Sequence, residues 1–201
     1  MVKVTKPYVF TGPGGTSVPL ASLFEGRQQL LIYHFMFSPE SDAGCSSCSF
    51  FADHVPNLSH LASRNTSFAA VSRAPIEKIE AFKKRMGWTF PWYSSAGTEF
   101  NYDFNVTMDE NVKPVMYNFR EKKELEERGL GYATRGEQQG MSVFWREKEG
   151  GDVFHTYSTY GRGNEKFMGT YQMLDITPFG RQDGRKPDLG FEYHDQYDIS
   201  S

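Results

Sequence analysis

The chain has 201 residues and a net charge of −3, and 38% of its residues are hydrophobic. This charge gives no electrostatic reason to expect binding to nucleic acid or to an anionic membrane surface. No apolar run reaches the roughly 18 residues that a membrane-spanning helix needs. The 17 Phe and 11 Tyr residues can build a substantial core, so we expect a single domain over 1–201 with additions.

The N-terminal residues Met1–Pro7 lack the apolar segment of a secretory signal peptide. We therefore expect a cytoplasmic location. In that reducing compartment a cysteine pair is more often catalytic than structural, and this chain has only two cysteines, Cys45 and Cys48.

The first predicted element is a β-hairpin. Apolar segments at 8–10 and 17–20 flank the turn sequence Gly-Pro-Gly-Gly at 12–15. A short helical turn over 21–26 follows. The stretch 29–37 is apolar on both faces, which is typical of a central parallel strand.

The next predicted element is a long helix from about Cys45 to Arg64. Pro56 lies inside it and is expected to kink it, because proline lacks the N–H that the helix would use. A strand at 67–71 comes next. A helix then runs from Pro75 to Gly87, with apolar residues at helical spacing, and a short extended segment follows.

Residues 98–139 break this regular order. They are polar and rich in glycine around a charged helix at 121–128. Because that helix has almost no apolar stripe, we expect an insertion that packs over the domain and carries specificity, not fold. A passive loop, or contacts to a second subunit in a homo-oligomer, are the alternatives.

The C-terminal part predicts a second hairpin and a last helix. Strands at 141–146 and 152–157 flank a Glu-Gly-Gly turn. Asn164 can cap a helix that follows. A polar tail covers about 181–201, with Phe191, Tyr193 and Tyr197 as candidate anchors. The whole order predicts an α/β fold with a mixed central sheet flanked by helices, which is the element order of thioredoxin-like folds.

The sequence Cys45-Ser46-Ser47-Cys48 lies where the central strand gives way to a helix. This pattern is typical of a thioredoxin-like redox site. Unpaired N–H groups and the helix dipole stabilise a thiolate at the helix start. We therefore predict Cys45 as nucleophile and Cys48 as resolving thiol, with the hydroxyls of Ser46 and Ser47 near the sulfur.

Other interpretations of the cysteine pair remain open. A structural disulfide across so short a loop would stabilise little. Structural zinc needs four ligands, and the sequence has no second pair at zinc-finger spacing. Two ordinary buried cysteines are also considered. With a histidine and Met36, the two thiolates would form a soft ligand set suited to copper.

Several motifs resemble the thioredoxin-like proteins grouped as domain of unknown function 899 (DUF899). They span almost the whole chain and comprise Tyr33-His34-Phe35-Met36-Phe37, Gly44–Phe50, Ala70–Pro75, Arg85–Trp92, Phe100–Phe104 and His194–Tyr197. The resemblance implies a thioredoxin-like fold.

The chain departs from better-known relatives at three places. Thioredoxins carry a proline before the hairpin strand, where this chain has Gln139-Gly140-Met141, and a tryptophan where it has Gly44. Peroxiredoxins use Pro-x-x-x-Thr-x-x-Cys, but the corresponding residues before Cys45 are Ser38 and Asp42. These departures argue against standard peroxide reduction and favour a small-molecule substrate.

Three residues outside the motif complete the predicted site. His34 lies near the end of the central strand, either beside Cys45 as a proton relay or bonded within the core. Trp92 belongs to an aromatic group at 90–104 that forms either a lid or core. Met141 begins the hairpin strand, and we group Trp92 and Met141 with Ser46 and Ser47 as substrate-binding residues.

These observations predict a thiol-disulfide oxidoreductase without a cofactor. Its partner would be a small-molecule or protein thiol or disulfide. The alternative is a metal-binding protein or metal-dependent oxidase that uses Cys45, Cys48 and a histidine.

Overall fold

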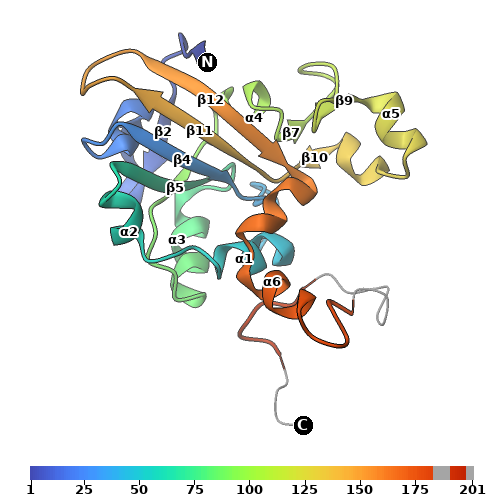
Figure 1. Ribbon diagram of the computed structural model, residues 1–201. Coiled ribbons are helices and arrows are strands. Elements are labelled where there is room, and N and C mark those ends of the chain that lie inside the picture. The colour runs from blue at the N-terminus through green and yellow to red at the C-terminus, as the bar shows by residue number, and fades with distance from the viewer. Residues whose placement is uncertain (183–190, 198–201) are drawn as a thin grey trace.

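The computed structural model describes residues 1–182 and 191–197. Figure 1 shows a twisted central sheet with helices packed against it. The sheet has eight strands in the order β1-β12-β11-β4-β5-β6-β2-β3. The strands are β1 (Val2–Lys3), β2 (Val9–Gly12), β3 (Thr16–Pro19), β4 (Gln29–His34), β5 (Thr66–Ser72), β6 (Trp92–Ser94), β11 (Gly140–Arg146) and β12 (Val153–Tyr160).

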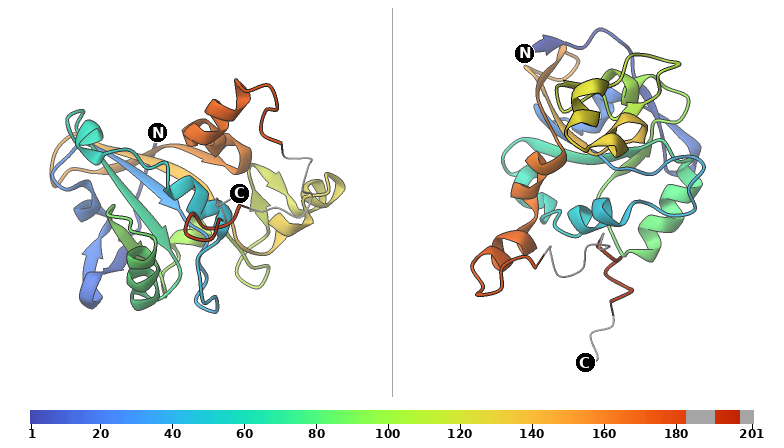
Figure 2. Two further views of the ribbon diagram at one scale, coloured as in Figure 1. Left: turned by 90° about the horizontal axis from the view of Figure 1, so that it is seen from below. Right: turned by 90° about the vertical axis from the view of Figure 1, so that its right-hand side faces the viewer.

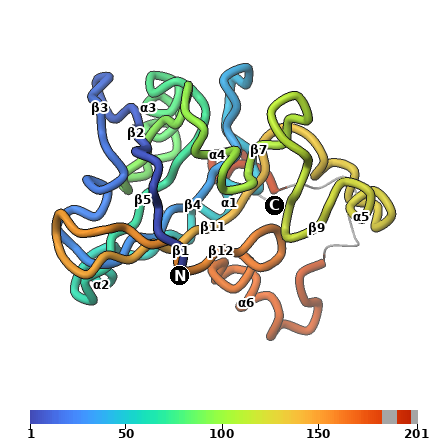
Figure 3. The backbone as a smooth tube through the Cα atoms, turned by 90° about the horizontal axis from the view of Figure 1, so that it is seen from above, coloured from blue at the N-terminus to red at the C-terminus, as the bar shows by residue number. Residues whose placement is uncertain are grey.

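Strand β4 occupies the middle of this sheet. It runs parallel to β5 and antiparallel to β11, with Tyr33 opposite Ala70 on one side and Met141 on the other. The prediction of a central strand in a mixed sheet is therefore confirmed. At one edge β1 pairs with β12, which brings the N-terminal residues beside the second hairpin (Figure 3).

Side chains alternate along β4 between two separate cores. Leu30 and Ile32 point to one face, and Tyr33 and Phe35 point to the other. Helices α1 (Ser46–Ala52) and α3 (Ile76–Arg85) cover the Tyr33 face. The right-hand view of Figure 2 shows the sheet between this helical layer below and the yellow segment above.

The prediction of one kinked helix from Cys45 to Arg64 is wrong, because this part of the chain forms two separate helices. Helix α1 ends at Ala52, and α2 (Leu58–Ala62) begins after Pro56. Proline cannot donate the next helical hydrogen bond. Asn57 then starts a new helix, since its side chain accepts from the Ser59 N–H at 3.0 Å.

Both predicted hairpins are confirmed, as β2–β3 and β11–β12. The last helix, α6 (Gly169–Asp175), begins later than expected. Asn164 does not cap it: this residue is buried within the 3₁₀ segment Gly161–Phe167. The predicted tail at 181–201 lies partly outside the described residues. No helix in the described ranges is long and apolar enough to cross a membrane.

The segment 98–139 contributes side chains to the core on the His34 face of the sheet. It forms short elements: α4 (Phe100–Asp103), β7 (Thr107–Met108), β8 (Met116–Tyr117), β9 (Arg120–Glu121), α5 (Lys122–Glu127) and β10 (Gly136–Glu137). Its buried apolar residues include Phe100, Phe104, Val106, Met108, Leu125 and Ala133. The charged helix α5 thus places Leu125 in the core, although its sequence shows almost no apolar stripe.

Candidate active site

The loop after β4 brings Cys45 to the first turn of α1. The Cys45 N–H donates to the Met36 carbonyl at 3.0 Å, which closes the loop back onto the end of the strand. Gly44 is buried: a Cβ here would lie 2.6 Å from the Phe35 ring and 2.8 Å from the Phe82 ring. A larger residue would displace the loop, which explains why no tryptophan precedes Cys45.

Hydrogen bonds to the Cys45 sulfur lower its pKa. The Cys48 thiol donates the bond with the largest effect, and the Cys48 N–H and both donors of Ser47 add to it. Burial opposes them, because a low dielectric disfavours the charged sulfur. The pKa of Cys45 nevertheless falls from 9.0 to about 6, so Cys45 is mostly in its reactive thiolate form at neutral pH.

Cys48 has the opposite character. Its side chain is fully buried, and this burial, together with the Cys45 sulfur, raises its pKa. Two donors partly offset the effect: the Met36 N–H lies 3.4 Å from the Cys48 sulfur, and the Tyr33 hydroxyl hydrogen-bonds to it. Both cysteines are free thiols, so one activated and one shielded sulfur lie a single turn apart.

Tyr33 is a site residue that we did not predict from the sequence. Its ring stacks on Phe51 of α1 with 3.8 Å between the centroids, and its hydroxyl donates to Gln139 Oε1 at 3.2 Å. Burial raises the pKa of Tyr33 well above its ordinary value, so the hydroxyl keeps its one proton, which it can donate either to Gln139 or to the Cys48 sulfur. Strand alternation places Tyr33 on the helix-bearing face, but the sequence does not show where its hydroxyl ends.

The structure does not place His34 beside Cys45, so the predicted proton relay at the cysteines is wrong in position. His34 points to the opposite face of the sheet from Tyr33, and its ring packs against Phe100 and Phe104. Burial lowers its pKa to about 3. The other interpretation, a histidine bonded within the core, describes the position of His34 better. Its hydrogen-bond partner is a side chain and not the backbone.

That partner belongs to a row of hydrogen bonds across three strands. His34 Nε2 lies 2.8 Å from Ser142 Oγ, which lies 2.8 Å from Ser158 Oγ. His155 Nε2 lies 2.8 Å from the same Ser158 oxygen. His34 Nδ1 has no hydrogen-bond partner among the described residues. The row connects the buried histidine to the surface on the face away from the cysteines.

The predicted substrate-binding residues divide into two groups. Ser47 bonds to the Cys45 sulfur, and Ser46 is half-buried in the first turn of α1. Trp92 and Met141 are only 2% and 4% exposed. Trp92 donates to Ser72 Oγ at 3.0 Å and packs on Phe35, and Met141 lies opposite Tyr33. The structure therefore places both in the core beneath the site, not on a surface that meets a substrate.

A pocket of about 380 Å³ opens beside Cys45. Its wall combines apolar, hydroxyl and charged side chains. They are Met36, Ala43, Ser38, Ser41, Glu40, Arg73 and Glu137, together with Cys45 and Gly136. The pocket is the space in which a molecule can meet the activated sulfur.

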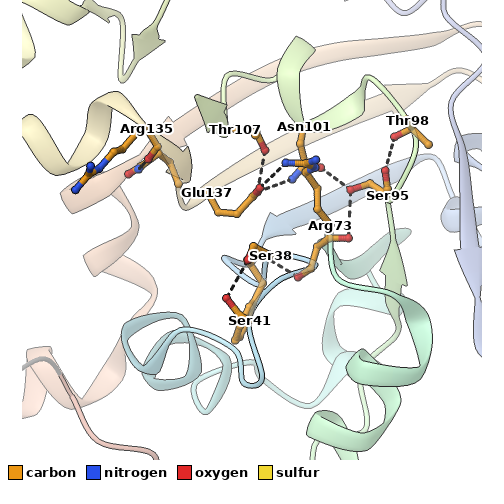
Figure 4. A network of polar contacts seen from close by, with 12 residues as sticks. Ser38, Ser41, Arg73, Ser95, Thr98, Asn101, Thr107, Arg135 and Glu137 are labelled. Carbon is orange, nitrogen blue, oxygen red and sulfur yellow. Dashed lines mark hydrogen bonds and ion pairs between the residues drawn. The ribbon is translucent and has the colours of Figure 1, made fainter. Parts of the chain in front are cut away.

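Arg73 and Glu137 form an ion pair in this wall, with 3.0 Å between Nη1 and Oε1. Figure 4 shows Glu137 also held by Thr107 and Asn101. Arg73 directly follows β5, at the carboxyl ends of the parallel strands, where ligands commonly bind. This position in the sequence could have identified Arg73 as a candidate site residue. Glu137 lies 64 residues further along the chain, and nothing in its local sequence marks it.

The C-terminal segment 191–197, which we call the strap, holds the cysteine loop from outside. The Tyr193 hydroxyl donates to the Gly44 carbonyl, and Phe191 stacks on Phe50 of α1 with 3.7 Å between centroids. Asp195 accepts two hydrogen bonds from Arg85, each of 2.9 Å. Phe191 and Tyr193 are the anchors that the sequence suggested, whereas Tyr197 is 45% exposed.

Residues 1–197 match the family model of a bacterial protein of unknown function, DUF899. The chain belongs to the DUF899 family. The resemblance inferred from the motifs is thus confirmed over nearly the entire sequence, strap included. Among proteins with curated descriptions, none matches this DUF899 chain.

Solved structures similar to this DUF899 chain include three peroxiredoxins. Peroxidoxin BcpB from Mycobacterium tuberculosis superposes with a TM-score of 0.51 and 13% identity, over 87% of this chain and 99% of the other. A PrxQ mutant from Xylella fastidiosa and peroxiredoxin Q from Xanthomonas campestris each give a TM-score of 0.50 and 13% identity, over 86% of this chain and 96% of theirs. The thioredoxin-like fold is thereby confirmed, and identities this low show the fold alone.

Proposed function

We propose that this DUF899 protein is a thiol-disulfide oxidoreductase with Cys45 as nucleophile and Cys48 as resolving thiol. The observation that supports it most directly is the Cys45 sulfur, whose pKa of about 6 follows chiefly from a hydrogen bond donated by Cys48. A thiolate at neutral pH with a second thiol in contact is what disulfide exchange requires.

The proposed reaction has two exchange steps. The Cys45 thiolate attacks one sulfur of a disulfide RSSR, which forms a Cys45–SR mixed disulfide and releases RS⁻. Cys48 then loses its proton and attacks the Cys45 sulfur, which closes the Cys45–Cys48 disulfide and releases the second RS⁻. The Cys48 proton and the proton that Cys45 released to solvent when it ionised end on the two RSH products. The protein gives up two electrons, and a thiol reductant restores it.

A small molecule or one specific partner is the proposed substrate class. The pocket beside Cys45 holds about 380 Å³, near the lower end of the usual range for small-molecule sites. No proline lies before Met141, where thioredoxins have one beside an extended protein substrate. Both observations favour a compact substrate over a general protein disulfide.

The first test mixes fully reduced protein with 2-hydroxyethyl disulfide and follows thiol release together with intact protein mass. We expect the wild type to become a Cys45–Cys48 disulfide, and Cys48→Ser to accumulate the mixed disulfide on Cys45. Cys45→Ser should react no faster than a free thiol. Unchanged exchange in Cys45→Ser would rule the proposal out.

The second test compares substrates. Insulin disulfides, 2-hydroxyethyl disulfide and hydrogen peroxide are supplied to the same reduced protein. We expect the small disulfide to react fastest. Brisk insulin reduction would remove the case for a compact substrate, and preferential peroxide consumption would replace disulfide exchange as the function.

The metal-binding alternative lacks the histidine that it requires at this site, although Met36, the other soft donor, lines the pocket with Cys45. Within 1–182 and 191–197, no group of three His, Cys, Asp or Glu side chains could hold a metal ion. The histidine expected to complete the set, His34, points to the other face of the sheet. The donor set around the cysteines therefore does not fit the metal centre that the sequence suggested.

A further inference from the structure

The pocket beside Cys45 has a cationic group in its wall that the proposed exchange reaction does not use. Arg73 and Glu137 both line this pocket with the nucleophilic sulfur. The carboxylate of the pair is withdrawn into the protein, since the Glu137 side chain is 8% exposed and that of Arg73 is 26% exposed. A molecule entering the pocket therefore meets the guanidinium before the carboxylate.

We propose that Arg73 binds a carboxylate on the substrate, so that the protein acts on low-molecular-weight disulfides or thiols that carry an acid group a few bonds from sulfur. This inference rests on the proposed function of Cys45 and Cys48. It adds the substrate class and a residue that selects it.

Arg73 retains donors for a second acid. A guanidinium has five N–H donors in a planar fork that suits carboxylates, and Glu137 takes a bond from Nη1 at 3.0 Å. The guanidinium also lies 5.2 Å from the centroid of the Tyr102 ring. The Tyr102 ring and Glu137 together fix the plane of the guanidinium. The N–H donors that Glu137 does not use are therefore oriented before a ligand binds.

Glu137 acts here as a positioning residue. Its Oε1 accepts from Arg73, and its Oε2 accepts from Thr107 at 2.8 Å and from Asn101 Nδ2 at 3.4 Å (Figure 4). Asn101 is held in turn by Ser95, whose hydroxyl donates to Asn101 Oδ1 at 2.7 Å. With both oxygens engaged by protein donors, Glu137 anchors the arginine and offers little to a ligand.

One exposed carboxylate, Glu40, also belongs to the pocket wall and opposes anion binding. Its pKa is lowered mainly by a backbone N–H and by Ser38, with Arg73 and Lys78 adding smaller effects. Lys78 lies nearby and donates to the carbonyls of Pro39 and Ser41. Lys78 also pairs with Asp42 at 4.0 Å, so it does not neutralise Glu40 alone. Arg73, and not Lys78, lines the pocket with Cys45, so its guanidinium is the group that can attract an acid there.

The step for such a substrate is the exchange described above, with a charged R group. Cys45 attacks the sulfur of an acid-bearing disulfide while Arg73 holds one carboxylate. The bound half becomes the mixed disulfide and the other half leaves as a thiolate. Cys48 then releases the bound half, the protein is oxidised by two electrons, and dithiothreitol serves as the reductant between turnovers.

Three disulfides of nearly equal length test this inference. They are 3,3′-dithiodipropionate, 2-hydroxyethyl disulfide and cystamine, which carry negative, neutral and positive ends. Each rate with reduced protein is divided by the rate of 2-mercaptoethanol with the same disulfide, because leaving-group pKa values differ. We expect the normalised wild-type rate to be highest for the acid.

Arg73→Met should lower the normalised rate with the acid about tenfold, the equivalent of about 1.4 kcal/mol. The readout is the ratio of the normalised rates with the acid and with 2-hydroxyethyl disulfide, which should fall in Arg73→Met. Arg73→Lys should give an intermediate ratio, because lysine keeps the charge but not the fork. Arg135→Met is the matched control. It removes a nearby exposed cation that does not line the pocket, and we expect it to preserve the preference.

Glu137→Gln keeps an acceptor for Arg73 and removes a negative charge, so the acid-to-amine rate ratio should rise. This variant keeps the inference testable if Arg73→Met does not fold. An unchanged preference in folded Arg73→Met, or a lower ratio in Glu137→Gln, would overturn the inference. If none of the three disulfides oxidises Cys45 and Cys48 in wild type, the proposed function itself fails, which is a distinct result.

Discussion

The two sulfurs differ because hydrogen bonds outweigh burial at Cys45, whereas burial outweighs hydrogen bonds at Cys48. Cys45 accepts from Cys48 and Ser47, whereas Cys48 is fully buried. The same contact that lowers the pKa of Cys45 raises that of Cys48. A residue-scale consequence is that neither thiol can be changed without shifting the titration of the other.

This coupling predicts the pH dependence of Cys45 alkylation. In wild type, the rate with iodoacetamide should rise with pH through a midpoint near the Cys45 pKa of about 6 and then level off. Cys48→Ala removes the donor with the largest effect, so its midpoint should move up toward the ordinary value. Alkylation rates from about pH 4.5 to 9.5 measure both.

Ser46→Ala is the matched control for that experiment. Ser46 neighbours the sulfur in sequence but is not among the groups that lower the Cys45 pKa. Its midpoint should equal that of wild type. A midpoint that does not move in Cys48→Ala would contradict the assigned role of the Cys48 thiol.

Tyr33 affords a second prediction at the scale of one residue. Tyr33→Phe keeps the ring on Phe51 but removes the hydroxyl that lowers the pKa of Cys48. The second exchange step should slow by about 2–10-fold, the range expected for one hydrogen bond, while alkylation of Cys45 stays the same. The lifetime of the mixed disulfide, followed by rapid quenching and mass, is the measurement.

The control substitution is Tyr157→Phe, at a tyrosine that is 47% exposed on β12. It should leave both exchange steps unchanged. Equal lifetimes in Tyr33→Phe and wild type would mean that the Tyr33 hydroxyl does not assist Cys48.

At the scale of elements, the connection from β4 to α1 depends on one glycine. Gly44→Ala would place a Cβ 2.6 Å from Phe35 and 2.8 Å from Phe82. Overpacking of this kind lowers the free energy of unfolding by about 1–3 kcal/mol. Urea unfolding measures the change. Gly131→Ala is the matched control, because a Cβ there meets no atom within 4 Å and should change stability by at most about 0.5 kcal/mol.

The order of the elements was predictable because apolar periodicity and turn residues are local signals. Strand β4, both hairpins and α3 follow directly from them. The Cys45 position at the start of α1 followed as well, since it depends on the same strand-to-helix junction. Local signals failed where one sequence pattern allows two structures. Pro56 is compatible with either a kinked helix or two separate helices, and the cap that Asn57 provides for α2 selects the second.

The position of His34 shows a different limit. Alternation along β4 places His34 and Tyr33 on opposite faces, but the sequence does not tell which face α1 covers. Glu137 is a third kind of miss, because it joins Arg73 only through contacts across 64 residues. Pairings that the folded chain alone creates leave no local pattern.

At the scale of the molecule, the segment 98–139 belongs to the core on one face of the sheet. We therefore expect it to be needed for stability as well as for the pocket wall. Leu125→Ala removes a fully buried side chain and should lower the free energy of unfolding by about 2–5 kcal/mol. Val112→Ala, at a residue that is 55% exposed, is the control in the same segment. Equal stabilities would instead support the prediction from the sequence, that this segment carries specificity and not fold.

The strap sets an order of events during synthesis of the chain. Tyr193 is added 149 residues after Gly44, whose carbonyl its hydroxyl holds. While the ribosome is still extending the chain, the cysteine loop therefore lacks its outer support. During this time Cys45 and Cys48 would meet cellular reductants and oxidants in a loop that the strap does not yet hold. The pair would reach its final reactivity only once the strap has docked.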